Sequence, residues 1–365
     1  MLCVAIVLLT ILRSPVPARA WGNDGHEIVA FIAADNLTPA AASHVAGILG
    51  VPADKRAIAR AMEAASIRPD SEFREDASTT SWHYIDICLQ DRRTDVPARC
   101  PGGNCVTRKI DEYAKRLKDS HYDHWGAAGD LAFLIHFVGD IHQPLHAAND
   151  ADRGGNCVAV DSHSRARDLH AVWDTTVVRR LEYSVDSGRP ETTARRLEST
   201  YAAEIAADSW IAADDIAWES NQLARADIYA ALQIPIEPCE PTVNLCRNPS
   251  GRVVELDSTY LDHADALAGH QLAKAGFRLA SLLNGIWTQP AAMNDVTREA
   301  QASSSVQGVS SKPAVTGEIV GNRRSKIYAW PGCGTYDMMA PANRVVFASP
   351  AAAEQAGYRA ARNCP

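Results

Sequence analysis

The sequence predicts a mainly α-helical protein, and three observations support this fold class. Segments rich in Ala and Leu dominate residues 21–287, and the alternation of β-branched and polar residues that marks strands is scarce there. Residues 130–142 carry apolar side chains at helical spacing, and Pro144 should end that helix. Residues 264–287 form a second long amphipathic segment.

Length and composition are those of a globular protein. The chain has 365 residues, of which 46% are hydrophobic and 22% charged, so global disorder is excluded. The net charge of −8 excludes a simple nucleic-acid binder that relies on a basic patch. It still allows phosphate substrates if metal ions supply the positive charge.

Residues 1–20 have the pattern of a signal peptide. The apolar run at 2–12 is too short for a membrane span, and Ala18-Arg19-Ala20 is suited to signal-peptidase cleavage. A positively charged start is missing, and the alternative is an uncleaved anchor or a buried helix. Cleavage would make Trp21 the first residue of a protein exported to the periplasm or beyond the cell, without membrane attachment.

Cysteine usage agrees with export. Eight cysteines remain after cleavage, and an even number in an exported chain suggests disulfides. Short loops favour Cys100–Cys105 and Cys239–Cys246, and Cys88 and Cys157 would then remain for each other. A long-range Cys88–Cys239 link is the rival arrangement, and the sequence alone does not decide between them.

The C-terminal part of the chain changes character. Residues 294–317 are polar and rich in Ser, which is typical of a flexible linker. Residues 318–365 contain strand-like pieces at 326–330 and 344–347, followed by an Ala-rich segment that predicts a helix. We therefore expect a helical domain at 21–293 and a small α+β module at 318–365.

Histidine and aspartate recur at helical spacing. His136 and Asp140 are four residues apart, and His170 and Asp174 repeat the spacing, so each pair lies on one helix face. Imidazole and carboxylate groups on a rigid scaffold suit zinc, and His146 lies nearby. The alternative is an ordinary polar face or a local hydrogen bond. However, Asp140 lies in an apolar run, where burying an unpaired carboxylate would be costly.

Five motifs follow one another along residues 21–174. They are Trp21-Gly-x-x-Gly-His26, Trp82-His-Tyr-Ile-Asp86, His136-Phe-Val-Gly-Asp140-Ile-His-Gln-Pro-Leu-His146, Asp152-Arg-Gly-Gly-Asn156 and Leu169-His170-x-x-Trp-Asp174. Together they closely resemble the zinc-dependent single-strand-specific nucleases, the family of mung bean nuclease. The resemblance spans residues 21–287 and implies a helical fold, shared with zinc-dependent phospholipase C, with three zinc ions at the base of a cleft.

The resemblance also implies a ligand set. The three ions would be held in turn by Asp70, His83, His136 and Asp140; by His146, His170 and Asp174; and by His26, a bridging Asp140, and the α-amine and carbonyl oxygen of Trp21. A free amine exists at Trp21 only if the chain is cleaved after Ala20. The signal-peptide and metal predictions therefore support each other.

The implied activity is endonucleolytic cleavage of single-stranded DNA and RNA to 5′-phosphate products by a secreted monomer, with 3′-nucleotides as further substrates. Our mechanistic hypothesis is in-line attack by a hydroxide generated at zinc, with Asp70 orienting it and zinc stabilising the departing 3′-oxygen. By resemblance, Tyr84 would stack on a base and Asp86 would contact its edge, which requires an unpaired strand. The alternative for Tyr84 is a core aromatic.

The sequence departs from the family pattern at two places. Phe73 stands where the family commonly has an arginine that contacts phosphate; Arg74 follows and could take that role or be an ordinary surface residue. Asp168 replaces the usual Asn two residues before His170 and could accept a hydrogen bond from it. Asn156 could shape the substrate pocket.

The tail resembles the metal-binding domain of the Ada DNA-repair methyltransferase. That domain holds zinc through four cysteines, but this tail has only Cys333 and Cys364, so a disulfide is expected instead. Its basic cluster, Arg323, Arg324 and Lys326, could help to hold nucleic acid or be a plain solvated surface.

Two other functions compete with the nuclease. A zinc-dependent phospholipase C is the main rival, but that family has a wider spacing after its N-terminal Trp and a Glu where this chain has Asp174. The second rival, a non-catalytic zinc-binding or adhesion protein, is disfavoured because all nine ligand positions are filled.

Overall fold

A computed structural model describes residues 21–73, 76–162, 164–183, 188–205, 209–239 and 246–288, and in the tail residues 319–323, 326–330, 343–347, 353 and 356–361. The predicted signal peptide, the linker, Arg74, Arg324, Cys333 and Cys364 lie outside these residues. The chain divides into two compact units, residues 1–292 and 293–365, and each is described by itself.

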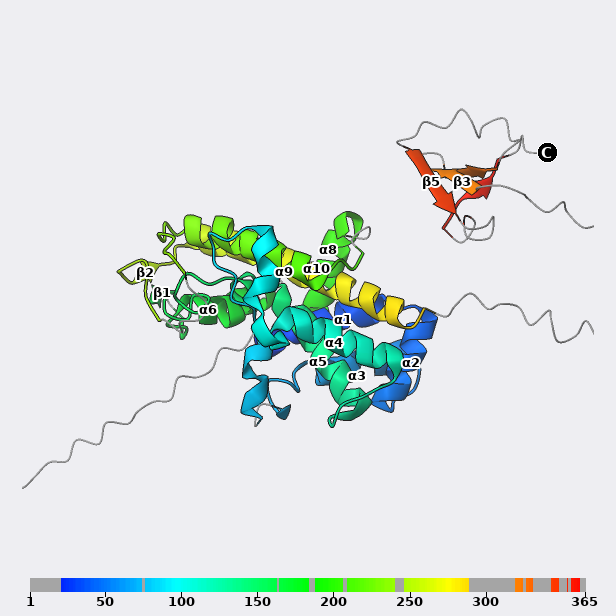
Figure 1. Cartoon of the computed structure of the whole chain (residues 1–365), viewed down its shortest axis with the longest axis horizontal. Coiled ribbons are helices and arrows are strands. Elements are labelled where there is room, and N and C mark those ends of the chain that lie inside the picture. The colour runs from blue at the N-terminus through cyan, green and yellow to red at the C-terminus, as the bar shows by residue number, and fades with distance from the viewer. Residues whose placement is uncertain are drawn as a thin grey trace, which may run out of the picture. The chain divides into compact units, whose positions relative to one another are not determined.

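The first unit is a bundle of helices, which confirms the predicted mainly α fold (Figure 1). Its α-helices are α1 (Gly22–Asp35), α2 (Pro39–Leu49), α3 (Lys55–Ser66), α4 (Val106–Asp119), α5 (Gly126–Ile141), α6 (Leu169–Ala171), α7 (Val178–Tyr183), α8 (Pro190–Ile205), α9 (Ala213–Leu223) and α10 (Ser258–Ile286). Shorter 3₁₀ or π segments connect them: η2 (Ala77–His83), η3 (Arg93–Arg99), η4 (Pro101–Gly103), η5 (Pro144–Ala147), η6 (Val172–Val177) and η7 (Ala224–Ala230).

Helix α5 runs through the centre of this unit. Every residue from Gly129 to Ile141 is buried, as expected of a helix that is apolar on all sides. The helix ends at Ile141, and Pro144 becomes the first residue of η5, where its fixed φ is tolerated. The predicted boundary is therefore correct to one residue, and the turn places His146 directly after the helix that carries His136 and Asp140.

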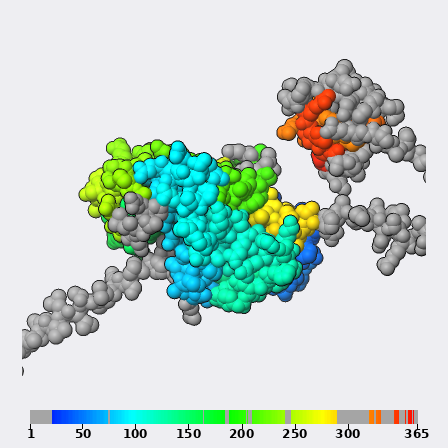
Figure 2. All heavy atoms as spheres, in the orientation of Figure 1, coloured from blue at the N-terminus to red at the C-terminus, as the bar shows by residue number. Residues whose placement is uncertain are grey.

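Helix α10 packs against α5 and begins before residue 264, where the sequence predicts its start. It starts at Ser258 because the side chain of Asp257 accepts a hydrogen bond from the Tyr260 amide at 2.8 Å and caps the first turn. It packs against α1, α2, α5 and α8. Figure 2 shows its yellow C-terminal end beside the blue N-terminal helices. No helix among the described residues has the length and apolar character needed to cross a bilayer.

Three disulfides tie loops to the helical body: Cys88–Cys239, Cys100–Cys105 and Cys157–Cys246. The Cys100–Cys105 prediction is confirmed, whereas the short Cys239–Cys246 loop and the Cys88–Cys157 pair are wrong. The cysteine pairing depends on tertiary structure. The segment before α10 runs beside the loop before α6, and strands β1 (Val160–Asp161) and β2 (Val254–Glu255) of these two segments pair in parallel. This contact brings Cys246 beside Cys157, and Cys239 pairs with Cys88, which confirms the rival long-range link.

The second unit contains a four-stranded sheet in the order β5-β3-β4-β6. Its strands are β3 (Ile319–Asn322), β4 (Ile327–Ala329), β5 (Arg344–Phe347) and β6 (Arg359–Ala360). β4 and β5 lie where strands are predicted, but β3 and β6 are additional. The expected Ala-rich helix falls mostly outside the described residues. Ile319, Tyr328, Ala353 and Tyr358 form the small core.

Candidate metal centre

The structure brings the predicted ligands together from distant parts of the chain. His26 lies on α1, His136 and Asp140 on α5, and His146 in η5 directly after it. The remaining ones come from the segment after α3, the end of η2, α6 and the wide π turn η6: Asp70, His83, His170 and Asp174. All are buried except His83, which is partly exposed. π turns of this kind often occur at functional sites.

The first half of the centre surrounds Asp140. His83 Nδ1 lies 3.0 Å from both His136 Nε2 and Asp140 Oδ2, and His136 Nε2 lies 3.4 Å from the same oxygen. Asp70 Oδ1 is 3.9 Å from each of the two imidazole nitrogens. Ligand atoms around a tetrahedral zinc ion with bonds of about 2.0–2.1 Å are separated by about 3.3 Å. The donor atoms of His83, His136 and Asp140 are therefore spaced as such an ion requires, whereas Asp70 lies further out and is grouped with His26 and His136.

The second oxygen of Asp140 faces a different histidine. His26 Nε2 lies 3.3 Å from Asp140 Oδ1, and the His26 ring stacks on the His136 ring with 3.8 Å between centroids. Gly139 makes this approach possible, because a Cβ there would lie 2.7 Å from His26 Nδ1. The two oxygens of Asp140 thus point to two neighbouring sets of donors, as a bridging carboxylate would.

The second half contains His146, His170 and Asp174. His146 Nε2 and His170 Nε2 are 3.1 Å apart, and Asp174 Oδ2 is 3.3 Å from His170 Nε2. Asp174 Oδ1 lies 4.0 Å from His146 Nε2. These donor atoms all lie within 4.8 Å of one another, so they can converge on one ion.

Backbone carbonyls fix the protonation of three imidazoles. The Nδ1 atoms of His136, His146 and His170 donate to the carbonyl oxygens of Ser66, His83 and Gly154 at 2.7, 2.8 and 2.6 Å. Carbonyl oxygens only accept, so each Nδ1 carries the hydrogen and the neutral ring turns a bare Nε2 toward the centre. Two such lone pairs facing each other at 3.1 Å repel unless a cation lies between them.

Burial keeps these rings neutral. It lowers the pKa of His136 and of His170 to about 3, and it also lowers the pKa of His146. Asp70 Oδ2 and His26 Nδ1 are buried and have no hydrogen-bond partner among the described residues. Buried polar atoms without partners are rare and costly, and bound cations are one way to satisfy them. The donor set therefore fits metal ions.

The two carboxylates respond to burial in opposite ways. Burial would raise the pKa of Asp140, but His136, His26 and His83 around it lower that pKa well below its usual range. Burial raises the pKa of Asp174 well above its usual range, and the hydrogen bond from Gln143 offsets this only in part. Asp174 therefore needs a cation more than Asp140 does.

Trp21 lies against both halves. Its indole Nε1 donates to the carbonyl oxygen of Gly139 at 2.9 Å, and its ring is fully buried. A cavity of about 180 Å³ is lined by Trp21 and Asp174 among others. Gly22 must be small there, since a Cβ would lie 2.9 Å from the carbonyl oxygen of Asp174. The main chain of Trp21 is thus next to the centre.

The predicted substrate residues lie beside the ligands. Tyr84 follows His83 and is 38% exposed, so it is not a core aromatic. Asp86 is half-buried and accepts a hydrogen bond from Asn149 Nδ2 at 2.9 Å; burial raises its pKa to about 6. Asn156 is exposed, and its Nδ2 donates to the Arg153 carbonyl at 2.7 Å. Phe73, which stands where the sequence analysis expects an arginine in the family pattern, is buried against Trp125.

Two residues have roles that the sequence did not reveal. Gln143 is buried, donates from Nε2 to Asp174 Oδ1 at 2.7 Å and accepts from the Leu145 amide at the same distance. In the sequence, Gln143 stands out as a polar residue between His142 and His146 of a mostly apolar motif. Asp168 does not accept from His170, because Gly154 does; instead it caps α6 by accepting from the Ala171 amide at 2.8 Å.

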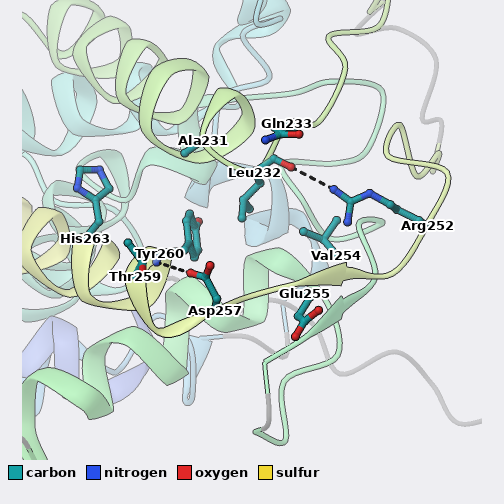
Figure 3. Close-up of a pocket in the computed structure, with 10 residues that line it drawn as sticks. All are labelled: Ala231, Leu232, Gln233, Arg252, Val254, Glu255, Asp257, Thr259, Tyr260 and His263. Atoms are coloured by element: carbon teal, nitrogen blue, oxygen red, sulfur yellow. Dashed lines mark hydrogen bonds between the residues drawn. The ribbon is translucent and has the colours of Figure 1, made fainter.

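A larger cavity of about 440 Å³ lies elsewhere in this unit, between η7, β2 and the start of α10. Figure 3 shows Arg252 donating to the Leu232 carbonyl at one side and Asp257 capping α10 at the other. None of the predicted site residues lines it. This cavity is therefore not where the chemistry-bearing residues converge.

Comparison with known proteins gives consistent matches. The sequence profile of S1/P1 Nuclease matches residues 21–288, and that of the metal binding domain of Ada matches residues 309–365. Nuclease P1 of Penicillium citrinum is 31% identical over 282 residues, which cover 73% of this chain and 97% of that protein. Nuclease S1 of Aspergillus oryzae is 29% identical over 286 residues (74% and 93%), and Endonuclease 2 of Arabidopsis thaliana is 28% identical over 294 residues (77% and 96%).

Proposed function

The chain belongs to the S1/P1 nuclease family, and on that premise we propose that it is a secreted, monomeric endonuclease with three zinc ions. Its substrates would be single-stranded DNA and RNA, cleaved to 5′-phosphate products, and 3′-nucleotides. The observation that carries the metal proposal is the pair of bare imidazole nitrogens of His146 and His170, 3.1 Å apart. Only a cation makes that arrangement favourable.

Three ligand groups would hold the ions: Asp70, His83, His136 and Asp140; His146, His170 and Asp174; and His26, Asp140 and the freed end of Trp21. Zinc lowers the pKa of a bound water to about 7 and neutralises phosphate charge. Three divalent ions would also offset the acidic ligands. The substrate can then approach a chain whose net charge is −8.

Asp70 would orient the attacking water. Its Oδ1 faces His83 and His136 at 3.9 Å, while its buried Oδ2 has no hydrogen-bond partner among the described residues. An oxygen in that position can accept a hydrogen from the water and align its lone pair for in-line attack on phosphorus. Asp70 would therefore act both as a ligand and as a catalytic residue.

Single-strand preference would come from the rim of the centre. The exposed ring of Tyr84 follows the ligand His83 and is available to stack on a base. Asp86, two residues further, would accept from or donate to the edge of the stacked base, because its pKa of about 6 allows both protonation states near neutral pH. Bases within a duplex are stacked and paired, so they would not enter. Asn156 and Arg74 would complete the pocket.

Export is supported by the three disulfides, which persist in oxidising compartments. Cleavage after Ala20 would supply the free amine at Trp21. The third ion needs the same cleavage, so the N-terminal residue of the mature protein tests both proposals.

The C-terminal module would be an accessory binder of nucleic acid. Residues 309–365 contain only two cysteines, so four thiolates for a zinc ion are not present. Residues 318–365 carry six basic and three acidic side chains, which leaves a net charge of −11 on residues 1–317. Arg344 and Arg359 lie in one row across the sheet with Asn322 and Ile327, and Arg323 and Lys326 flank that row. Removing residues 294–365 should raise KM for long DNA while leaving hydrolysis of a dinucleotide unchanged.

The decisive experiment is to purify the secreted protein, sequence its N-terminus, count zinc by mass spectrometry and assay four substrates. We expect Trp21 as the first residue, three zinc ions per chain, and hydrolysis of denatured DNA and RNA in preference to duplex DNA. Release of phosphocholine from lecithin without nucleotide release would instead establish the phospholipase alternative. A mature protein that begins elsewhere and remains fully active would remove the third site.

A further inference from the structure

A tight loop, residues 149–156, joins the two sides of the candidate site. The side chain of Asn149 donates to Asp86 Oδ1 at 2.9 Å and accepts from the Asp152 amide at 3.3 Å. Asp152 in turn accepts from the Tyr229 hydroxyl at 2.7 Å and is fully buried. The loop is therefore fastened to the segment that carries Tyr84 and Asp86.

Arg153 is an exposed residue of this loop. It lies between buried Asp152 and buried Gly154, whose carbonyl oxygen accepts from the ligand His170 at 2.6 Å. A Cβ at Gly154 would lie 2.4 Å from the Leu145 carbonyl, so the loop packs directly on η5, which carries His146. Arg153 thus precedes Gly154, whose carbonyl oxygen holds His170, a ligand in the second half of the centre. Tyr84 likewise follows His83, a ligand in the first half.

The backbone of Arg153 has an unusual conformation. Its φ is +60°, in the left-handed region that a non-glycine residue occupies at a cost of about 1 kcal/mol. The loop holds it there through hydrogen bonds from the Asn156 side chain to the Arg153 carbonyl and from the Cys157 amide to the Asp152 carbonyl. Glycine would be easier at this position, as it is at the next two. A long cation kept at such a cost points to a function for the side chain.

The charges of the chain and of its proposed substrate indicate what that function is. Residues 1–317 carry a net charge of −11, while the substrate is a polyanion. Phe73 fills the family's arginine position, and it is buried against Trp125, so it offers no contact to phosphate. Arg153 is exposed, and its loop is joined by the hydrogen bond from Asn149 to Asp86 to the segment that carries Tyr84. An exposed guanidinium on a loop that contacts both sides of the centre suits phosphate recognition.

We propose that Arg153 binds the backbone phosphate adjacent to the scissile one and so positions polynucleotides across the centre. This inference rests on the proposed nuclease function. The ions would engage the phosphate that is cleaved, whereas Arg153 would engage its neighbour. A substrate with a single phosphate would make no use of Arg153.

The test compares two substrates in three variants. Arg153→Gly removes the side chain and relieves the strained φ, so it should fold at least as well as the parent. Arg153→Lys keeps the charge, and Arg56→Gln, at an exposed position on α3, removes the same charge elsewhere. Steady-state kinetics would use a dT decamer and a dinucleoside monophosphate, with zinc content and melting temperature measured alongside.

For Arg153→Gly we expect KM for the decamer to rise about tenfold with kcat nearly unchanged, and the slope of log KM against log salt to fall by about 0.7, as loss of one single-strand phosphate contact requires. The dinucleoside monophosphate should be unaffected, Arg153→Lys should recover most of the loss, and Arg56→Gln should match the parent. Equal losses on both substrates, or no loss on the decamer, would overturn the proposal. If the parent protein hydrolyses neither substrate, the proposed function has failed instead.

Discussion

Asp140 and Asp174 occupy equivalent places in the two halves of the candidate centre, yet their surroundings differ. Each is buried and follows a histidine by four residues. Three imidazoles, from His26, His83 and His136, lie within 3.4 Å of Asp140 and lower its pKa. Asp174 has one imidazole nitrogen at 3.3 Å and another at 4.0 Å, both without a hydrogen, and its pKa rises.

The difference teaches that the two halves depend on metal to different degrees. The first half surrounds its carboxylate with three imidazoles, of which His26 and His83 can turn a hydrogen toward it, and it uses both carboxylate oxygens. The second half places a carboxylate and two lone pairs together and leaves their repulsion to be cancelled by a cation. Loss of metal should therefore disturb the second half first, whereas loss of the Asp140 side chain should affect more than one ion.

The largest expected effect follows from replacing each carboxylate. Asp140→Asn should remove two of the three proposed zinc ions, because the two oxygens of that side chain face two sets of donors, whereas Asp174→Asn should remove one. Activity on denatured DNA should fall by more than about 100-fold in both, since losses of that size already follow from altering outer-shell partners. Zinc counting by mass spectrometry distinguishes the variants. Loss of one ion in each would show that Asp140 does not bridge.

Chelation should lower stability, and more strongly at higher pH. Removing zinc at a concentration about 1,000-fold above its Kd costs about 4 kcal/mol, or about 10 °C in Tm. Without metal, native Asp174 keeps a proton that the unfolded chain releases above pH 4, so its contribution to apo stability falls as pH rises. The buried histidines are neutral with and without zinc, so they do not change the difference between the two forms. Asp140, with a lowered pKa, adds no slope in this range.

Differential scanning fluorimetry with and without chelator at pH 5.5 and 8 measures this effect. The drop in Tm should be larger at pH 8, and re-addition of zinc should reverse it. In Asp174→Asn the dependence of that drop on pH should shrink. A drop that is the same at both pH values would mean that the second half does not depend on its ion as we argue.

Gln143 should affect only the second half. Gln143→Leu keeps the volume but removes the hydrogen bond to Asp174, which should weaken zinc binding there by about 10- to 100-fold. Gln271→Leu is the matched control, because that buried glutamine also donates from Nε2 to an oxygen, the His142 carbonyl. Zinc titration of the apo protein should show one weakened site in Gln143→Leu and none in the control. Weakening of all sites would contradict a local role.

How much of this the sequence could predict depends on the kind of interaction. The i, i+4 pairs, the Pro144 break and the family motifs were enough to predict the two long helices α5 and α10 and which residues converge, because helical spacing and side-chain chemistry are local properties. The acceptors of Nδ1, from Ser66, His83 and Gly154, were not predictable, because every residue has a carbonyl and only the fold selects one. The Cys157–Cys246 link was missed for the same reason.

The smallest expected effect tests whether burial alone raises a carboxyl pKa in this protein, as we argue for Asp174. Asp150 is fully buried and lies outside the centre; its Oδ1 accepts from the Glu237 amide at 2.7 Å, and its Oδ2 has no hydrogen-bond partner among the described residues. Burial, with a contribution from Asp152, raises its pKa to about 7. Between pH 4 and 7 the native state therefore holds a proton that the unfolded chain has released, so the contribution of Asp150 to wild-type stability falls across that range.

Asp150→Asn keeps the acceptor oxygen and cannot ionise, so its advantage over the wild type should grow from near zero at pH 4.5 to about 1–2 kcal/mol at pH 7.5. Urea unfolding with saturating zinc measures this without disturbing the centre. Asp152→Asn is the control: it loses an acceptor for the Tyr229 hydroxyl and should be destabilised at every pH. If Asp150→Asn has the same pH dependence as the wild type, burial does not control carboxylate ionisation here. The contrast between Asp174 and Asp140 would then need another cause.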